Sequence, residues 1–144
     1  MLVIPEAVAK QIESEGVAAY PNECCGLLIG REAGGAGSRV VDRLVPMKNA
    51  FDEKEQYHRF TIDPLAMMEA EKTAEREGKA VLGFYHSHPD HPARPSEYDR
   101  QHVPPWSFYS HVIVAIHQRK PVDMTSWSMN EESEQFEPQR IVRE

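Results

Sequence analysis

The sequence has little cysteine. Cys24 and Cys25 are the whole complement, and they are adjacent. Neighbouring residues of an extended chain point to opposite faces, so these two thiols are poorly placed to bridge to one another. A disulfide framework and a cysteine-rich zinc site are therefore excluded, and we expect at least one of the two to be a small buried core residue.

Long apolar runs and basic clusters are also missing. No apolar stretch approaches the roughly 20 residues that a membrane-spanning helix requires, and residues 1–6 lack the pattern of a signal peptide. The net charge of −7, from 16 basic and 23 acidic side chains, argues against a nucleic-acid-binding surface. We therefore expect a cytoplasmic protein with neither a membrane nor nucleic acid as its partner.

The chain is long enough for one hydrophobic core, so we expect a single domain over residues 1–144. Helices are predicted over residues 5–15 with Gly16 near the helix end, from 64 to about 77 behind an N-cap at Asp63, and from 96 to a point before Pro104. Strands are predicted over residues 25–30, 39–47, 58–62, 79–85, 108–116, 122–129 and 135–142, with a turn at 32–38 and an exposed loop at 49–56. This order, without regular β-α-β alternation, predicts an α+β domain with a mixed or mainly antiparallel sheet.

The segment 85–99, with the sequence YHSHPDHPARPSEYD, concentrates metal-binding residue types. It follows the apolar run 80–84, which is typical of a buried strand. Residues i and i+2 of an extended chain face the same side, so His86 and His88 can converge on one point. Together with Asp99 they make a set of two imidazoles and a carboxylate, which suits zinc and leaves a fourth position open, as in catalytic sites.

Each of these residues also has a purely structural interpretation. A His-x-His pair by itself is compatible with polar residues where a strand leaves its sheet. Asp99 closes the string Ser-Glu-Tyr-Asp, which resembles a capping box at the start of a helix, and this role is compatible with facing a metal. Glu23, taken alone, is a solvated charge ahead of a strand. For His91, between the ligands, an exposed loop residue and a spare metal ligand are the alternatives.

The combination of His-Ser-His-Pro, a ten-residue spacer from the second histidine to the aspartate, and Pro-Ser-x-x-Asp closely resembles the JAMM motif of the MPN-domain metalloproteases, also called the JAB family. The segment 21–30, PNECCGLLIG, is similar to the first strand of that family and its upstream glutamate. The similarity runs from about Ile4 to about Phe136 and is greatest to small, single-domain prokaryotic members.

The resemblance implies a curved sheet flanked by helices, of MPN/JAB1-like and cytidine-deaminase-like architecture, with one zinc ion per chain at its edge. It implies that His86, His88 and Asp99 hold the zinc and that Glu23 is the catalytic acid–base. Zinc polarises a carbonyl and acidifies water, while one carboxylate can take the proton from water and give it to the departing amine. Ser96 resembles the serine that donates a hydrogen bond to the oxyanion, and a role as helix cap is equally supported.

The implied activity is zinc-dependent hydrolysis of the amide bond after the C-terminal glycine of a ubiquitin-like or sulfur-carrier protein with a Gly-Gly tail. The start Pro-x-Glu-x-Cys-Gly is similar to enzymes that release cysteine from a carrier–cysteine adduct, and others trim a carrier's tail. We expect the tail to pair with an exposed edge offered by residues 49–59.

Several alternatives remain open. One is a JAMM peptidase that acts like a deubiquitinase or cleaves cell-wall peptides. Another is a non-catalytic MPN scaffold, which is disfavoured because all the expected site residues, Glu23, His86, His88, Ser96 and Asp99, are present. A TIM-barrel amidohydrolase also carries a His-x-His pair, but that barrel needs roughly 250 residues. The oligomeric state stays open, a homodimer included.

Overall fold

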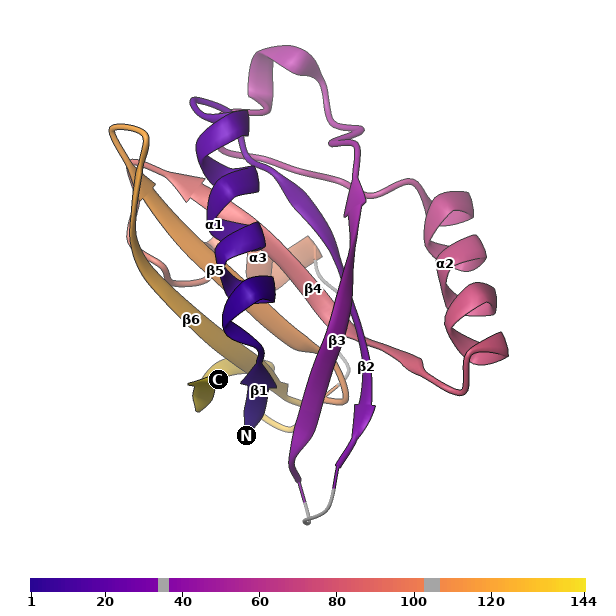
Figure 1. The fold of residues 1–144 in the computed structure, drawn as a ribbon. Helices are drawn as coiled ribbons and strands as arrows, with labels where there is room; N and C mark the ends of the chain where they lie inside the picture. The colour runs from indigo at the N-terminus through magenta and orange to yellow at the C-terminus, as the bar shows by residue number, and fades with distance from the viewer. Residues whose placement is uncertain (34–36, 103–106) are drawn as a thin grey trace.

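The computed structural model describes residues 1–33, 37–102 and 107–144, and within these ranges eight strands form one sheet (Figure 1). The strands are β1 (Leu2–Ile4), β2 (Cys25–Glu32), β3 (Arg39–Met47), β4 (Ala80–Pro89), β5 (Ser110–His117), β6 (Lys120–Asn130), β7 (Gln135–Gln139) and β8 (Ile141–Arg143). The helices are α1 (Glu6–Ala19), α2 (Pro64–Arg76) and α3 (Glu97–His102), with a 3-10 turn at Glu53–Glu55.

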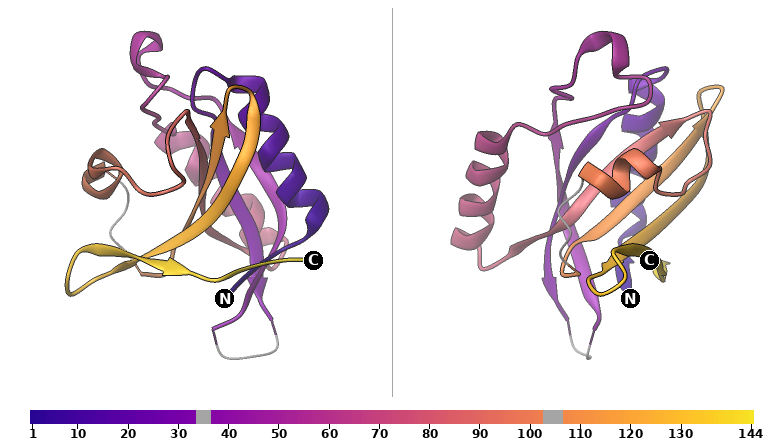
Figure 2. Two further views of the ribbon diagram at one scale, coloured as in Figure 1. Left: turned by 90° about the vertical axis from the view of Figure 1, so that its left-hand side faces the viewer. Right: turned by 180° about the vertical axis from the view of Figure 1, so that it is seen from behind.

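The sheet is mixed, and its strand order is β7-β6-β5-β4-β2-β3-β1-β8. β1 pairs in parallel with β3 and β8, and β4 pairs in parallel with β5, while the other neighbours are antiparallel. α1 crosses the face turned to the viewer in Figure 1, and α3 lies on the opposite face, as the view from behind shows (Figure 2, right). The predicted α+β fold with a curved, mainly antiparallel sheet flanked by helices is confirmed.

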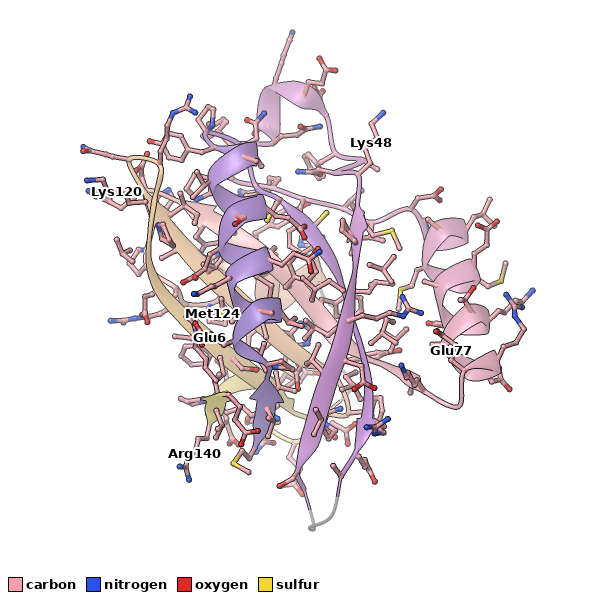
Figure 3. All side chains as sticks on the ribbon, in the orientation of Figure 1. Glu6, Lys48, Glu77, Lys120, Met124 and Arg140 are labelled. Atoms are coloured by element: carbon pink, nitrogen blue, oxygen red, sulfur yellow. The ribbon has the colours of Figure 1, made fainter. Side chains whose placement is uncertain are left out.

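The curvature is strong enough for one residue to connect the two ends of the sheet. β7 lies at one end and β8 at the other, yet only Arg140 separates them along the chain (Figure 2, left). The side chain of Arg140 points away from the sheet (Figure 3), and its carbonyl accepts a hydrogen bond of 2.8 Å from the backbone N–H of Leu2. The edge strand predicted over 135–142 is therefore confirmed for residues 135–139 and wrong beyond them, since β8 pairs with β1, a strand that was not predicted.

Alternation along β4 decides which face carries the histidines. Tyr85 packs with Ile12 of α1 in the cluster on one face, and Phe84 packs with residues of α2 in the cluster on the other. Because successive side chains of a strand point to opposite faces, His86 and His88 lie on the same face as Phe84. The site is therefore on the face opposite α1.

The first helix is longer than the sequence predicted. It continues to Ala19 instead of ending at residue 15. Gly16 was expected near its end but is buried inside it, and a Cβ at this position would lie only 2.9 Å from the side chain of Ile116. The glycine thus permits close packing of α1 on β5 and does not end the helix.

Residues 58–62 were predicted as a strand, and this was wrong. They lie outside every described strand, and the side chain of Asn49 holds them instead. Its Oδ1 accepts a hydrogen bond from the backbone N–H of Thr61 at 3.2 Å, and its Nδ2 donates to the carbonyl of Arg59 at 2.9 Å. The segment 49–59 is likewise a loop with a 3-10 turn, so the expected strand edge for a substrate tail is not formed there.

The other elements lie close to their predicted positions. The N-cap of α2 is confirmed, since Oδ1 of Asp63 accepts a hydrogen bond from the backbone N–H of Leu65 at 3.2 Å. β4 runs on to Pro89, beyond the predicted end at residue 85, because β5 pairs with it along that stretch. Part of the predicted turn at 32–38, and Pro104, lie outside the described residues. None of the helices in the described ranges is long and apolar enough to cross a bilayer.

Candidate metal centre and active site

Three possible ligand atoms converge where β4 approaches α3. Nε2 of His86 lies 3.0 Å from Nε2 of His88 and 3.3 Å from Oδ2 of Asp99, and the distance from Nε2 of His88 to Oδ2 of Asp99 is 3.2 Å. All three residues are buried. Ligand atoms about 2.0–2.1 Å from one ion at tetrahedral angles are about 3.3 Å apart, so this triangle fits one face of a zinc tetrahedron.

No fourth His, Cys, Asp or Glu joins this group within the described ranges. The three residues therefore match the donor set of a site with an open position, and both nitrogens and the carboxylate suit zinc chemically. The two Nε2 atoms and Oδ2 of Asp99 all face one another, which is the arrangement of atoms that share one cation.

The neighbouring strands and one loop carbonyl orient the histidines. β4 pairs with β2 on one side, where Cys25 is opposite His86, and with β5 on the other. Nδ1 of His88 lies 2.8 Å from the carbonyl oxygen of Pro92. Nδ1–H therefore donates to that carbonyl, which leaves the lone pair of Nε2 for the shared centre. The ring of Phe60 stacks on His86 with a centroid distance of 4.5 Å.

Ser96 and Asp99 form a reciprocal cap at the start of α3. The backbone N–H of Asp99 donates to Oγ of Ser96 at 3.0 Å, and the backbone N–H of Ser96 donates to Oδ2 of Asp99 at 2.9 Å. This is the capping-box arrangement, with aspartate in the position that glutamate usually takes. The helix-cap interpretation of Ser96 is confirmed, and its hydroxyl hydrogen stays available to a substrate oxygen.

The charges of the cluster support one another. Burial by itself raises the pKa of Asp99, but the charge of His86 and hydrogen bonds to both histidines hold it well below its usual range. Burial lowers the pKa of His86. Burial is also the largest single effect at His88, but the hydrogen bonds to Asp99 and to the carbonyl of Pro92, together with the charges of Glu23 and Asp99, outweigh it and raise the pKa. A carboxylate that stays ionised in a buried place is the electrostatic counterpart of a bound cation.

Glu23 reaches the same centre from the start of β2. Continuing the β2–β4 register beyond Cys25 and His86 places Glu23 opposite His88. Only 5 % of Glu23 is exposed, and its Oε1 is buried without a hydrogen-bond partner among the described residues. Burial raises its pKa to about 8, although the charges of His88 and Arg59 act against the shift. A buried carboxyl group with a free oxygen is suited to exchange protons with a ligand.

A loop, not the sheet, holds the backbone of Glu23. Its N–H donates to the carbonyl of Gln56 at 2.8 Å, and its carbonyl accepts from Nδ2 of Asn49 at 3.4 Å. The same Asn49 side chain binds the backbone of Arg59 and Thr61, so one amide ties Glu23 to the segment that carries Phe60. Sequence reasoning missed Asn49, Arg59 and Phe60, because no motif or periodicity marks them.

Two hollows adjoin the ligand cluster. A cleft of about 600 Å³ is lined by Glu23, His88, Ser96, Arg59, His91 and Arg94, among others. A smaller hollow of about 260 Å³ is lined by Asp99 and by the aromatic side chains of Phe60, Phe84 and Tyr98, with others. The ligand cluster therefore has space for a substrate beside His88 and beside Asp99.

The remaining predicted residues have structural positions. Cys25 is buried and Cys24 half-buried, both are free thiols, and neither joins the ligand cluster, as expected. Oγ of Ser87 accepts a hydrogen bond from the backbone N–H of Cys24 at 2.8 Å, which continues the β2–β4 pairing. His91 is exposed on the loop after β4, as expected, and is not part of the cluster.

The chain is similar in sequence to two proteins whose names describe an activity. It is 34 % identical over 99 residues to a probable TtuB-protein conjugate cleaving protease of Thermus thermophilus, covering 69 % of this chain and 61 % of the relative. It is 29 % identical over 145 residues to a desampylase of Pyrococcus furiosus, covering 98 % and 90 % of the two chains. The chain thus spans about three fifths of the Thermus relative.

Solved structures show the same fold. A protein from Desulfitobacterium hafniense superposes with a TM-score of 0.83 at 30 % identity, covering all of this chain and 93 % of the other. A JAB1/MPN domain protein from Archaeoglobus fulgidus superposes with a TM-score of 0.59 at 21 % identity, covering 97 % and 96 %. Residues 5–130 match the family model described as prokaryotic homologs of the JAB domain. The chain therefore belongs to the prokaryotic JAB-domain family.

Proposed function

We propose that this protein is a zinc-dependent hydrolase of the amide bond that follows the C-terminal glycine of a ubiquitin-like or sulfur-carrier protein. The observation that carries the proposal is the buried triangle of His86, His88 and Asp99 with the carboxyl group of Glu23 beside it. Zinc held by the three ligands would polarise the scissile carbonyl and acidify water.

Glu23 is the proton carrier in this proposal. Its Oε1 is buried and has no hydrogen-bond partner among the described residues. Its raised pKa brings proton exchange close to neutral pH. As a carboxylate it accepts a proton from the attacking water, and as a carboxylic acid it donates that proton to the departing amine. A single residue can do both because the two transfers occur in turn.

Ser96 supports the developing oxyanion. Its oxygen is engaged as the cap of α3, so the O–H bond is the part left to interact with the substrate. A hydroxyl donor fixed in this way loses little freedom when it binds the transition state, which is the condition for effective electrostatic stabilisation.

The names of the relatives support the substrate class. One relative is named for cleaving conjugates of the TtuB protein and another is named a desampylase, and we infer a conjugate of a small ubiquitin-like protein for this chain as well. We assign the Gly-Gly tail, which has no side chains, to the smaller hollow of about 260 Å³ that Phe60, Phe84 and Tyr98 line together with Asp99.

The test combines metal content with turnover. The purified protein should contain one zinc per chain by elemental analysis, and intact-mass analysis should show the carrier released with a free Gly-Gly end. Glu23→Gln should keep the zinc and lose the cleavage. A protein without stoichiometric zinc, or one that binds the conjugate and never cleaves it, would instead be a non-catalytic scaffold.

A further inference from the structure

The larger cleft is basic although the chain is acidic. The net charge is −7, yet the ionisable side chains around this cleft include Arg59, Arg94 and His91, and its one carboxyl group is that of buried Glu23. The charge at this place is therefore opposite to that of the whole chain. Such a local reversal favours an anionic ligand group.

Both arginines have donors to spare. Arg94 is exposed, and its guanidinium has no hydrogen-bond or ion-pair partner among the described residues. Arg59 lies with its guanidinium 4.0 Å above the ring of Tyr98, and its one side-chain hydrogen bond in the described chain goes to the carbonyl of His58 at 2.9 Å. By contrast, Arg43 and Arg100 are each paired with a glutamate.

The position of Glu23 indicates which part of a substrate enters this cleft. A general acid must reach the nitrogen that leaves, so the leaving group lies on the side of the cluster where Glu23 lies. That side is the larger cleft, and its volume of about 600 Å³ is in the range of small-molecule sites. We assign the carrier tail to the smaller hollow, which is lined by Asp99.

We propose that Arg59 and Arg94 bind the α-carboxylate of the leaving group. The proposal rests on the proposed function and selects, among the substrates considered, a carrier tail extended by a single α-linked amino acid with a free carboxylate. In an α-linked residue the carboxylate carbon is two bonds from the scissile nitrogen, within the same cleft. In a lysine joined through its side chain, the α-carbonyl is much farther away and is part of a peptide bond.

The proposal is tested with two carrier substrates that share the tail Gly-Gly-Ala and differ only in a terminal carboxylate or carboxamide. Hydrogen bonds to a charged group predict that the zinc-loaded enzyme prefers the acid by about 10- to 100-fold in kcat/KM. Arg94→Gln and Arg59→Gln should each bring the acid-to-amide ratio close to one. Arg76→Gln, on the outer side of α2, makes the same change away from the cleft and should keep the full preference.

Binding gives a readout that does not depend on turnover. In the Glu23→Gln background, calorimetry with peptides carrying the same two tails should show a Kd at least about tenfold lower for the acid, lost on adding Arg94→Gln. Equal kcat/KM and equal Kd for acid and amide would overturn the carboxylate site and leave the proposed hydrolase standing. Failure of the zinc-loaded enzyme to cleave either substrate would count against the proposed function, and this inference would fall with it.

Discussion

His86 and His88 lie inside β4, hydrogen-bonded to β2 on one side and to β5 on the other, whereas Glu23 lies just before β2 and is tied to a loop through Gln56 and Asn49. The sheet thus fixes the two histidine ligands, and the cap of α3 fixes Asp99. The proton-transfer half depends on a few side-chain and loop hydrogen bonds. The difference suggests that substitutions in the two halves separate metal binding from turnover.

The largest effect is expected in the strand half. His88→Ala removes one corner of the ligand triangle and leaves Asp99 buried with one imidazole fewer, so zinc and activity should be lost together. Elemental analysis and a cleavage assay check both. His91→Ala, a histidine on the exposed loop, is the matched control and should retain one zinc. A full equivalent of zinc in His88→Ala would remove this residue from the ligand set.

Glu23→Gln should impair proton transfer and leave metal binding intact. The amide keeps the size of the carboxyl group but cannot accept a proton from water, so kcat should fall by about 10²–10⁴-fold while zinc content stays the same. Steady-state kinetics on metal-quantified protein measure this, with Glu75→Gln on the surface of α2 as the control. Turnover near the wild-type value would mean that another group carries the proton.

Asn49→Ala probes the loop that holds Glu23. The change removes the amide that bonds the backbone of Glu23, Arg59 and Thr61, so the carboxyl group and the Phe60 segment should lose their fixed positions. We expect kcat/KM to fall by about tenfold with zinc unchanged, since small misplacements are costly in catalysis. Asn130→Ala, at the end of β6, serves as the control. Loss of zinc from Asn49→Ala would show that the two halves are not independent.

Substitution of His111 is expected to have the smallest effect on metal binding and turnover at neutral pH. This third buried histidine lies on the same face of the sheet as His86 and His88. It is paired in register with Phe84, and its Nε2 has no partner among the described residues. Burial lowers the pKa of His111 from 6.5 to about 4. Between these two pH values the histidine is protonated in the unfolded chain but neutral in the folded chain. Stability is therefore lost as pH falls from about 6.5 towards 4, by about 3 kcal/mol.

His111→Phe should remove that acid sensitivity. Urea unfolding at pH 7, 5.5 and 4.5 would show a free energy of unfolding that falls less steeply with acid than in the wild type. The zinc content of the variant should be normal, because His111 is outside the ligand cluster. Parallel pH curves for the two proteins would contradict the assignment of this histidine.

The sequence predicted the parts of the site that follow from periodicity. Two-residue alternation placed His86 and His88 on one side of a strand, and the Ser96–Asp99 spacing predicted the cap, because both are set by local backbone geometry. Recognition of the motif supplied Glu23, whose nearness to His88 is a consequence of strand register between segments far apart in the chain.

What was missed depends on tertiary context. Asn49 supplies bonds that a strand partner would otherwise give to residues 58–62, so an apolar pattern was misread as a strand. Gly16 was read as a helix end because its role is set by Ile116, exactly one hundred positions away. β1 is three residues long and becomes a strand only through partners at residues 39 and 141. Local propensity carries no information about such distant neighbours.

The junction at Arg140 also bears on how the chain is made. β1 is translated before its partner β8, which begins at Ile141, so Leu2 must wait until the residues between the two strands have been added. At about 5–20 residues per second that delay is on the order of ten seconds. During synthesis the apolar strand Leu2–Ile4 has an open edge, which is a site for wrong pairing between nascent chains. A chaperone that shields short amino-terminal strands would therefore be expected to raise the yield of this protein.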